Sequence, residues 1–259
     1  MQVDLNNQVA FVCGSSSGIG RAIAVVLAKN GADIVLNGRA EAPAREVIDE
    51  IQRLGRKVIF EKADISEYHD MKRAADHALS EFGKIDILVV SGGVTGSGLK
   101  SDLFLETPPE SYLAWAKTRW CSRLYCVRAV LDPMVQRRTG KIVLISTDAG
   151  RWPTPSECMA GSLGAAVVMT TKVLAQELSR WQIRVNTICL TAMEGTPSYN
   201  YATQLSARLA GVFKKALAKQ PFRVTSEDVA NAALFFCSDE SNAITGQILS
   251  VNGGLSFPG

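Results

Sequence analysis

The chain has 259 residues, of which 47% are hydrophobic and 20% charged, and its formal net charge is +3. These values are typical of a globular protein that is long enough to bury a large core. The small net charge and the lack of a basic run argue against a nucleic-acid partner. The six cysteines form no Cys-x-x-Cys pair, and no apolar run approaches the roughly 20 residues that span a bilayer. We therefore expect a cytoplasmic protein with no membrane partner.

Short apolar runs alternate along the chain with amphipathic runs. The apolar runs are rich in Val and Ile and are bounded by Gly, Asp or Asn, which predicts buried strands. The seven predicted strands cover 8–14, 33–38, 57–64, 85–93, 141–147, 183–189 and 246–254. The predicted helices cover 18–30, 41–54, 66–82, 108–138, 157–180, 202–218 and 226–237. This alternation predicts an α/β fold with one doubly wound, Rossmann-like parallel sheet and helices on both faces.

The organisation of the chain indicates one domain over residues 1–259, because no linker and no internal repeat interrupts it. The least regular stretch is 191–201, "TAMEGTPSYNY". We expect it to form a mobile loop over the functional site.

A glycine-rich turn follows the first predicted strand and opens the first predicted helix. Gly14, Gly18 and Gly20 fall at this boundary, where side chains would block both a tight turn and the approach of a pyrophosphate. The backbone N–H groups at the start of the helix, that of Ile19 included, would face the anion. The same glycines also serve close packing of strand and helix when no ligand is bound. Both interpretations stay open from the sequence.

The Gly-x-x-x-Gly-x-Gly spacing resembles that of the short-chain dehydrogenase/reductase family. Further similar segments are "KADIS", "GKIDILVVSGG", "GKIVLIST", "IRVNTIC" and "ITGQILSVNGG", so that the resemblance covers essentially the whole chain. It implies a dinucleotide site in which Asp64 contacts adenine. Members that prefer NAD carry an acid where this chain has Gly38, and the Arg39 that follows could pair with a 2′-phosphate. This favours NADP, unless Arg39 is only a surface residue.

The catalytic positions of that family are altered in this sequence. The resemblance implies a proton-transferring Tyr, a Lys four residues later, a Ser that holds the substrate oxygen and an Asn on the preceding helix. These positions align with Ala160, Gly164, Thr147 and Arg119. Alanine and glycine cannot move a proton, and one general acid–base group contributes about 10²–10⁴ in rate. We therefore assign no catalytic residue and expect that no cofactor is required, with residual NADP binding left open.

The segments that hold nicotinamide in the family also have a different sequence in this chain. Val90–Gly93 replaces Asn-Asn-Ala-Gly, and Leu190-Thr191 replaces Pro-Gly. The other polar candidates near the altered site are Asp148, Arg151, Glu157, Cys158 and Glu194. Cys158 has no histidine partner in view. His69 and His77 lie eight residues apart on one amphipathic helix, where we expect them to face solvent and to form no metal site.

In the family, the helices matching 108–138 and 157–180 pair across a two-fold axis. The chain resembles the degenerate chains of two-subunit dehydrogenases, such as that of anaerobic toluene degradation, which oxidises a hydroxybenzylsuccinyl-CoA thioester. We therefore predict an inactive subunit that forms a hetero-oligomer, a heterotetramer, with an active NAD(P)-dependent paralogue acting on a hydroxyacyl-CoA of aromatic degradation. One alternative is a hydratase or lyase that uses Glu157 or Glu194. Another is an NADP-sensing module without turnover.

Overall fold

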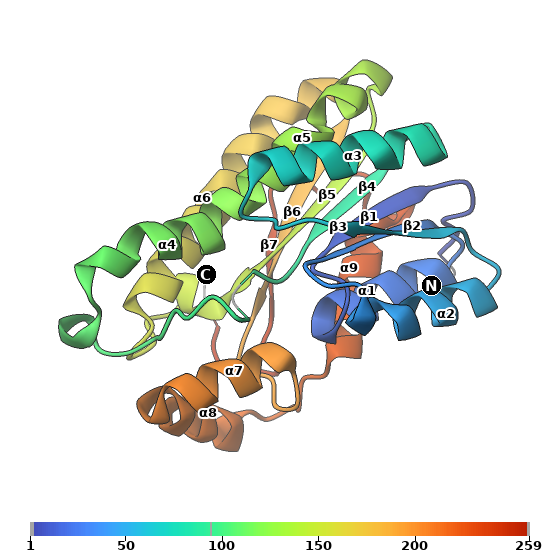
Figure 1. Cartoon of the computed structure of the whole chain (residues 1–259). Coiled ribbons are helices and arrows are strands. Elements are labelled where there is room, and N and C mark those ends of the chain that lie inside the picture. Colours follow the sequence, from blue (N-terminus) through green and yellow to red (C-terminus); the bar gives the residue numbers. More distant parts are fainter. Residues whose placement is uncertain (1–2, 94, 258–259) are drawn as a thin grey trace.

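The computed structural model describes residues 3–93 and 95–257. Its centre is a seven-stranded, wholly parallel sheet with strand order β3-β2-β1-β4-β5-β6-β7 (Figure 1). The strands are β1 Val9–Cys13, β2 Asp33–Gly38, β3 Val58–Lys62, β4 Ile87–Val90, β5 Gly140–Thr147, β6 Ile183–Leu190 and β7 Ile248–Val251. The predicted doubly wound parallel sheet is confirmed. The assignment of one domain to residues 1–259 stays a prediction.

Helices cover both faces of the sheet (Figure 1). They are α1 Gly18–Lys29, α2 Arg45–Arg53, α3 Tyr68–Phe82, α4 Tyr112–Ala116, α5 Ser122–Arg137, α6 Cys158–Leu178, α7 Pro197–Leu205, α8 Ala207–Lys219 and α9 Ser226–Cys237. The apolar sides of α1, α2 and α9 form one core with the sheet, and those of α3, α5 and α6 form another on the opposite face. Strand β1 contributes side chains to both cores. Ala10 and Val12 belong to one core, and Val9 and Phe11 belong to the other.

The predicted helix 108–138 is interrupted in the structure. It begins with a 3₁₀ turn and α4, passes through a π-helical stretch at Lys117–Cys121, and continues as α5. Stretches of π-helix are rare and frequently lie at functional sites. This one carries Arg119, which makes the interruption relevant to the site.

The prediction of a loop over 191–201 is wrong for its second half, because α7 begins at Pro197. The Thr196 hydroxyl accepts a hydrogen bond from the Tyr199 backbone N–H at 3.3 Å, and proline suits the first helical position. At Ser206 the chain becomes extended, and the hydroxyl caps α8 by accepting from the Leu209 backbone N–H at 3.1 Å. The predicted helix 202–218 is therefore two helices, which project beyond the sheet (Figure 1).

The stretch Cys158–Trp181, which contains α6, is long and apolar enough to cross a membrane, judged by length and composition alone. In the fold, its buried side packs against β5 and β6. About 33% of its apolar window is buried inside the fold, and the other side is exposed. The cytoplasmic location of the protein stays a prediction.

Candidate functional site

A cavity of about 520 Å³ lies at the carboxyl ends of β1, β4, β5 and β6. Strand β1 has β2 on one side and β4 on the other, so the connections leave it in opposite directions. Ligands of open α/β sheets bind at such a reversal, outside the carboxyl ends of the strands. The cavity wall runs from the glycine turn, past Ser91 and Thr147, to the two helices α7 and α8.

The glycine turn has the geometry that close approach to an anion requires. Gly14 has a φ of +66°, and a Cβ there would lie 2.4 Å from the Ser91 carbonyl oxygen. A Cβ on Gly20 would lie 2.2 Å from the Gly14 carbonyl oxygen. Gly14, Gly18, Ile19 and Gly20 all line the cavity. Gly14 and Gly20 thus admit no side chain, and the turn presents the start of α1 to the cavity.

The buried Asn37 of β2 holds this turn in place, and sequence reasoning missed it. Its side-chain oxygen accepts from the Gly14 N–H at 3.2 Å, and its backbone carbonyl accepts from the Ser15 N–H at 2.9 Å. Its side-chain amide donates to the carbonyls of Glu61 and Ala63 in the β3 region. The only sequence signal was a polar residue inside an otherwise apolar strand.

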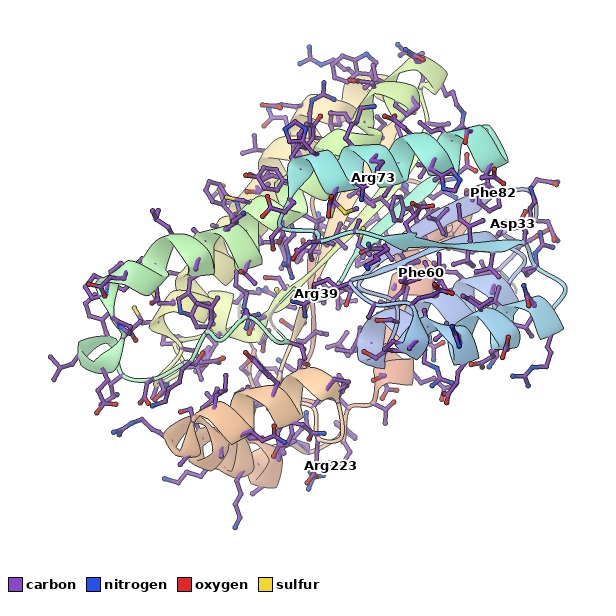
Figure 2. The ribbon with its side chains drawn as sticks, in the orientation of Figure 1. Asp33, Arg39, Phe60, Arg73, Phe82 and Arg223 are labelled. Atoms are coloured by element: carbon purple, nitrogen blue, oxygen red, sulfur yellow. The ribbon has the colours of Figure 1, made fainter. Side chains whose placement is uncertain are left out.

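Arg39 and Asp64 lie outside the residues that line the cavity. The Arg39 guanidinium donates to the Thr95 carbonyl and lies beside Gly96, in the segment that follows β4 (Figure 2). The Asp64 carboxylate accepts a hydrogen bond from the Ser66 N–H at 2.8 Å. Arg39 follows β2 and Asp64 follows β3. Both strands lie in the half of the sheet that also contains β1 and the glycine turn.

At the aligned catalytic positions, the facing surfaces of β5 and α6 are in tight contact. Ala160 is 1% exposed. A Cβ on Gly164 would lie 2.7 Å from Thr147 Cγ2 and 3.2 Å from Gly150 Cα. Thr147 lines the cavity, and its hydroxyl accepts from the Ala149 N–H at 3.3 Å. The Thr147 methyl group therefore occupies the space beside residue 164.

Arg119 and Glu157 both line the cavity, as does the buried Trp115. The Arg119 guanidinium carbon lies 5.7 Å from the centre of the Trp115 ring. Burial lowers the pKa of Arg119 and raises the pKa of Glu157, and the opposite charge of each partner offsets the shift only in part. Within the described residues, no ion pair of 4.0 Å or less joins them. The charge of each group therefore affects the pKa of the other, but the two groups do not form a salt bridge.

Arg123, one turn after Arg119, is the second site residue that sequence reasoning missed. It is buried and donates to the carbonyls of Thr118 and Gly92 at 3.0 Å and of Ile145 at 3.3 Å. Burial lowers its pKa to about 10. The arginine fixes the altered segment after β4 to the end of β5. Its position inside an amphipathic helix pattern gave no sign of this role.

The remaining polar candidates divide into structural and exposed residues. The Asp148 carboxylate accepts three hydrogen bonds, from Ser250 Oγ at 2.5 Å, Ser256 Oγ at 2.6 Å and Asn252 Nδ2 at 2.7 Å. The Arg151 guanidinium donates to the Ile248 carbonyl and the Ser250 hydroxyl. The exposed residues are Cys158, Glu194, His69 and His77. The prediction that both histidines face solvent is confirmed.

Comparisons with known proteins agree with this architecture. A 3-oxoacyl-[acyl-carrier-protein] reductase FabG of Chlamydia muridarum is 32% identical over 97% of this chain and 98% of its own length. The (2S)-[(R)-hydroxy(phenyl)methyl]succinyl-CoA dehydrogenase subunit BbsD of Thauera aromatica is 32% identical over 98% of both chains. A solved 7α-hydroxysteroid dehydrogenase, in complex with NADH and 7-oxo glycochenodeoxycholic acid, matches with a TM-score of 0.87 at 29% identity, over 98% of this chain and 96% of that one.

The expectation that no cofactor is required is wrong. The 7α-hydroxysteroid dehydrogenase carries NADH on the same fold. The physical reason lies in the glycine turn, which here keeps the positive φ of Gly14 and the side-chain-free approach at Gly20. The altered residues Thr147 and Ala160 belong to β5 and α6, whereas the glycine turn joins β1 to α1 and is intact.

Family membership rests on most of the chain. A family model described as enoyl-(acyl carrier protein) reductase matches residues 14–256. The relatives match over nearly their full lengths, and the solved structure, in complex with NADH, has the same fold. The chain belongs to the short-chain dehydrogenase/reductase family of oxidoreductases.

Proposed function

We propose that this chain is a non-catalytic subunit that assembles with an active, NAD(P)-dependent paralogue and supports it. The paralogue would act on a hydroxyacyl-CoA thioester of aromatic-compound degradation. The observation that carries the proposal is that the positions aligned with the family's Tyr and Lys are the buried Ala160 and Gly164, which lies against Thr147. Neither residue has a side chain that can transfer a proton.

Hydride transfer between a dinucleotide and an alcohol needs a proton acceptor within hydrogen-bonding reach of the substrate oxygen. Ala160 takes the aligned position of the family's Tyr and is buried. No side chain fits at Gly164 while the Thr147 methyl group stays in place, since the distance to an added Cβ is 2.7 Å. The two substitutions are thus matched to each other, and restoring a Lys at residue 164 alone would displace Thr147.

The outer side of α6 supports the assembly part of the proposal. Met169 is 59% exposed and Val173 is 46% exposed, and with the exposed Ala165 they form an apolar stripe at helical spacing. Exposed apolar stripes of this kind are a common mark of a protein–protein interface. The relative BbsD is itself a subunit of a dehydrogenase, and its name identifies an acyl-CoA substrate. A BbsD-like chain is therefore the partner we propose, in a heterotetramer.

The residues present fit a dinucleotide, which supplies the hydride chemistry in this family when bound. The backbone of Gly14, Gly18, Ile19 and Gly20 would hold the pyrophosphate, and Asp64 the adenine.

Arg39 would pair with a 2′-phosphate, because a guanidinium suits the bidentate recognition of phosphate. We expect the chain to bind NADPH about tenfold more tightly than NADH, and Arg39→Ala to abolish that difference. Calorimetric titration of the chain and of the variant with each dinucleotide measures this difference in affinity. Equal affinities in the unaltered chain would contradict the assignment of Arg39.

Activity measurements on separated and combined chains test the proposal. The chain alone and the co-purified pair are each supplied with NAD(P)⁺ and (2S)-[(R)-hydroxy(phenyl)methyl]succinyl-CoA, and formation of reduced dinucleotide is followed. We expect no turnover by this chain alone and turnover by the pair. Replacing the paralogue's own catalytic Tyr by Phe should abolish the activity of the pair. Turnover by this chain alone would overturn the proposal.

A further inference from the structure

The wall of the cavity contains hydrogen-bond donors that no group of the protein satisfies. In the described part of the chain, the side chain of Arg119 makes no hydrogen bond, and its Nε is inaccessible and unpaired. The indole Nε1 of Trp115, stacked near the same guanidinium, is also inaccessible and unpaired. Unpaired buried donors are uncommon in folded proteins because each one costs about 1–3 kcal/mol. The terminal nitrogens of the Arg119 guanidinium, which lines the cavity, also have no acceptor among the described residues, and an acceptor bound in the cavity could reach them.

The charges around these donors favour a negatively charged acceptor. Arg119 and Arg123 lie one helical turn apart, and the nearby carboxylates are Glu157 and Asp148. The Asp148 carboxylate is already occupied by three donors from the C-terminal segment. Glu157 forms no ion pair with Arg119 within 4.0 Å among the described residues. The site therefore has two guanidinium groups and one carboxylate that does not reach Arg119.

The rest of the cavity suits an apolar body. Its volume of about 520 Å³ lies within the range of small-molecule sites, which is about 300–1,000 Å³. The large apolar and aromatic side chains that line it include Leu99, Trp115, Trp152, Tyr199, Val212 and Phe213. Tyr199 of α7 and Phe213 of α8 stack on each other with ring centres 5.8 Å apart. These two helices thus provide an aromatic wall of the cavity, on elements other than the helical stretch that carries Arg119.

We propose that this cavity binds an organic acid with an apolar body, whose carboxylate pairs with the Arg119 guanidinium and whose body lies against the aromatic wall. The carboxylate site is distinct from the glycine turn, because Arg119 belongs to the helical layer of α5 and α6, whereas the turn opens α1 on the other face of the sheet (Figure 1). The proposal concerns the chain by itself and does not depend on the partner.

Calorimetric titration of the full chain with matched acids and amides tests the proposal. The pairs are 4-phenylbutyrate with 4-phenylbutyramide, and octanoate with octanamide. We expect the acid of at least one pair to bind tenfold or more tightly than its amide, the effect of a hydrogen bond to a charged group. Arg119→Met should bring that ratio to about one. Glu157→Gln should tighten acid binding, because it removes the one competing negative charge at Arg119.

Two control variants separate direct pairing from general electrostatics. Lys214 is exposed on α8 and does not line the cavity, so Lys214→Met removes the same charge away from the proposed site and should leave the ratio unchanged. Arg119→Lys keeps a cation in place, provides a folded comparison if Arg119→Met unfolds, and should retain part of the preference. Equal binding of acid and amide, no binding of either pair, or an unchanged ratio in Arg119→Met would each overturn the proposal. Loss of dinucleotide binding in Arg119→Met, with the acid preference intact, would overturn it too.

Discussion

Gly150 shows how a single residue determines the closeness of two elements at the site. A Cβ at this position would lie 2.5 Å from the Gly164 carbonyl carbon and 2.6 Å from the Ala165 nitrogen, both in the backbone of α6. The turn after β5 therefore touches the helix directly. This contact brings Thr147 and α6 together and leaves no space for a catalytic side chain at residue 164.

We expect Gly150→Ala to destabilise the fold by about 2 kcal/mol, because a backbone atom cannot move away as a side chain can. The matched control is Gly211→Ala inside α8, where an added Cβ has no neighbour within 4 Å. That change should stabilise the protein by about 0.5–1 kcal/mol through helix propensity. Urea unfolding of both variants measures the two free energies, and equal effects would contradict the packing argument.

His77 provides a pH-dependent contribution at the residue scale. Its Nδ1 lies 2.5 Å from Glu61 Oε1, and this hydrogen bond raises the pKa of the histidine above 6.5. The folded state therefore holds the proton more tightly than the unfolded state. The stabilisation is fully present below about pH 6.5 and is lost as the pH rises through the higher folded pKa.

We expect His77→Gln to lower the free energy of unfolding at about pH 5.5 and to have a smaller effect at about pH 9. Thermal or urea unfolding at the two pH values measures the difference. His69→Gln is the control, because His69 forms no ion pair among the described residues. A His77→Gln effect that is the same at both pH values would rule out this linkage.

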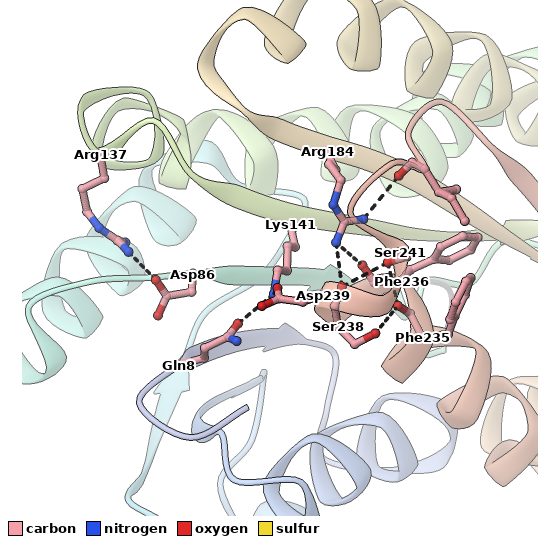
Figure 3. Close-up of polar contacts among 11 residues, drawn as sticks. Gln8, Asp86, Arg137, Lys141, Arg184, Phe235, Phe236, Ser238, Asp239 and Ser241 are labelled. Carbon is pink, nitrogen blue, oxygen red and sulfur yellow. Dashed lines mark hydrogen bonds and ion pairs between the residues drawn. The ribbon is translucent and has the colours of Figure 1, made fainter. Parts of the chain in front are cut away.

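At the scale of elements, Arg184 joins β6 to the end of α9. The arginine is 9% exposed and donates to the carbonyls of Phe236 and Ser238 at 3.0 Å and of Ile244 at 3.3 Å (Figure 3). These carbonyls end the last helix and lead into β7. One buried side chain thus positions the C-terminal segment, which in turn supplies Ser250, Asn252 and Ser256 to Asp148.

Replacing this arginine by methionine leaves buried carbonyls without donors, so Arg184→Met should destabilise the protein by about 3 kcal/mol. Arg128→Met is the control, since Arg128 forms only an exposed pair with Asp132 and such pairs contribute about 0–1 kcal/mol. Chemical denaturation compares the two variants. A loss no larger than that of the control would show that the carbonyls find other partners.

The helices show where a sequence pattern is informative and where it is not. Thr196 and Pro197 form a recognisable helix start for α7, but the irregular composition around them favours a loop. The break after Leu205 depends on Ser206, whose hydroxyl caps α8. The π-helical stretch around Arg119 has no comparable signal, since its residues continue an ordinary helical pattern.

For the whole molecule, the sheet could be predicted almost completely, because strands buried on both faces appear as continuous runs of Val and Ile. The cavity could be predicted only in part. The glycine turn is recognisable because its spacing is strict. Glu157 lines the cavity, as the sequence indicates, whereas Glu194 is exposed and does not line it. The roles of Asn37 and Arg123 arise from contacts between distant segments, which no local pattern encodes.

The exposed stripe on α6 tests the proposed assembly at the same scale. Met169→Glu places a charge in an apolar interface, so we expect it to weaken association with the paralogue tenfold or more, without unfolding the chain. Leu54→Glu is the control, because Leu54 is 39% exposed beyond the end of α2, on the other face of the sheet. Analytical ultracentrifugation measures the association of each variant with the paralogue. Unchanged association of the Met169 variant would exclude this stripe from the interface.

Native mass spectrometry of the protein isolated from its source cells tests the central claim most directly. The account predicts a complex that contains two copies of this chain and two copies of a second short-chain dehydrogenase that retains the catalytic Tyr and Lys. A homo-oligomer of this chain, with no second chain bound, would contradict it.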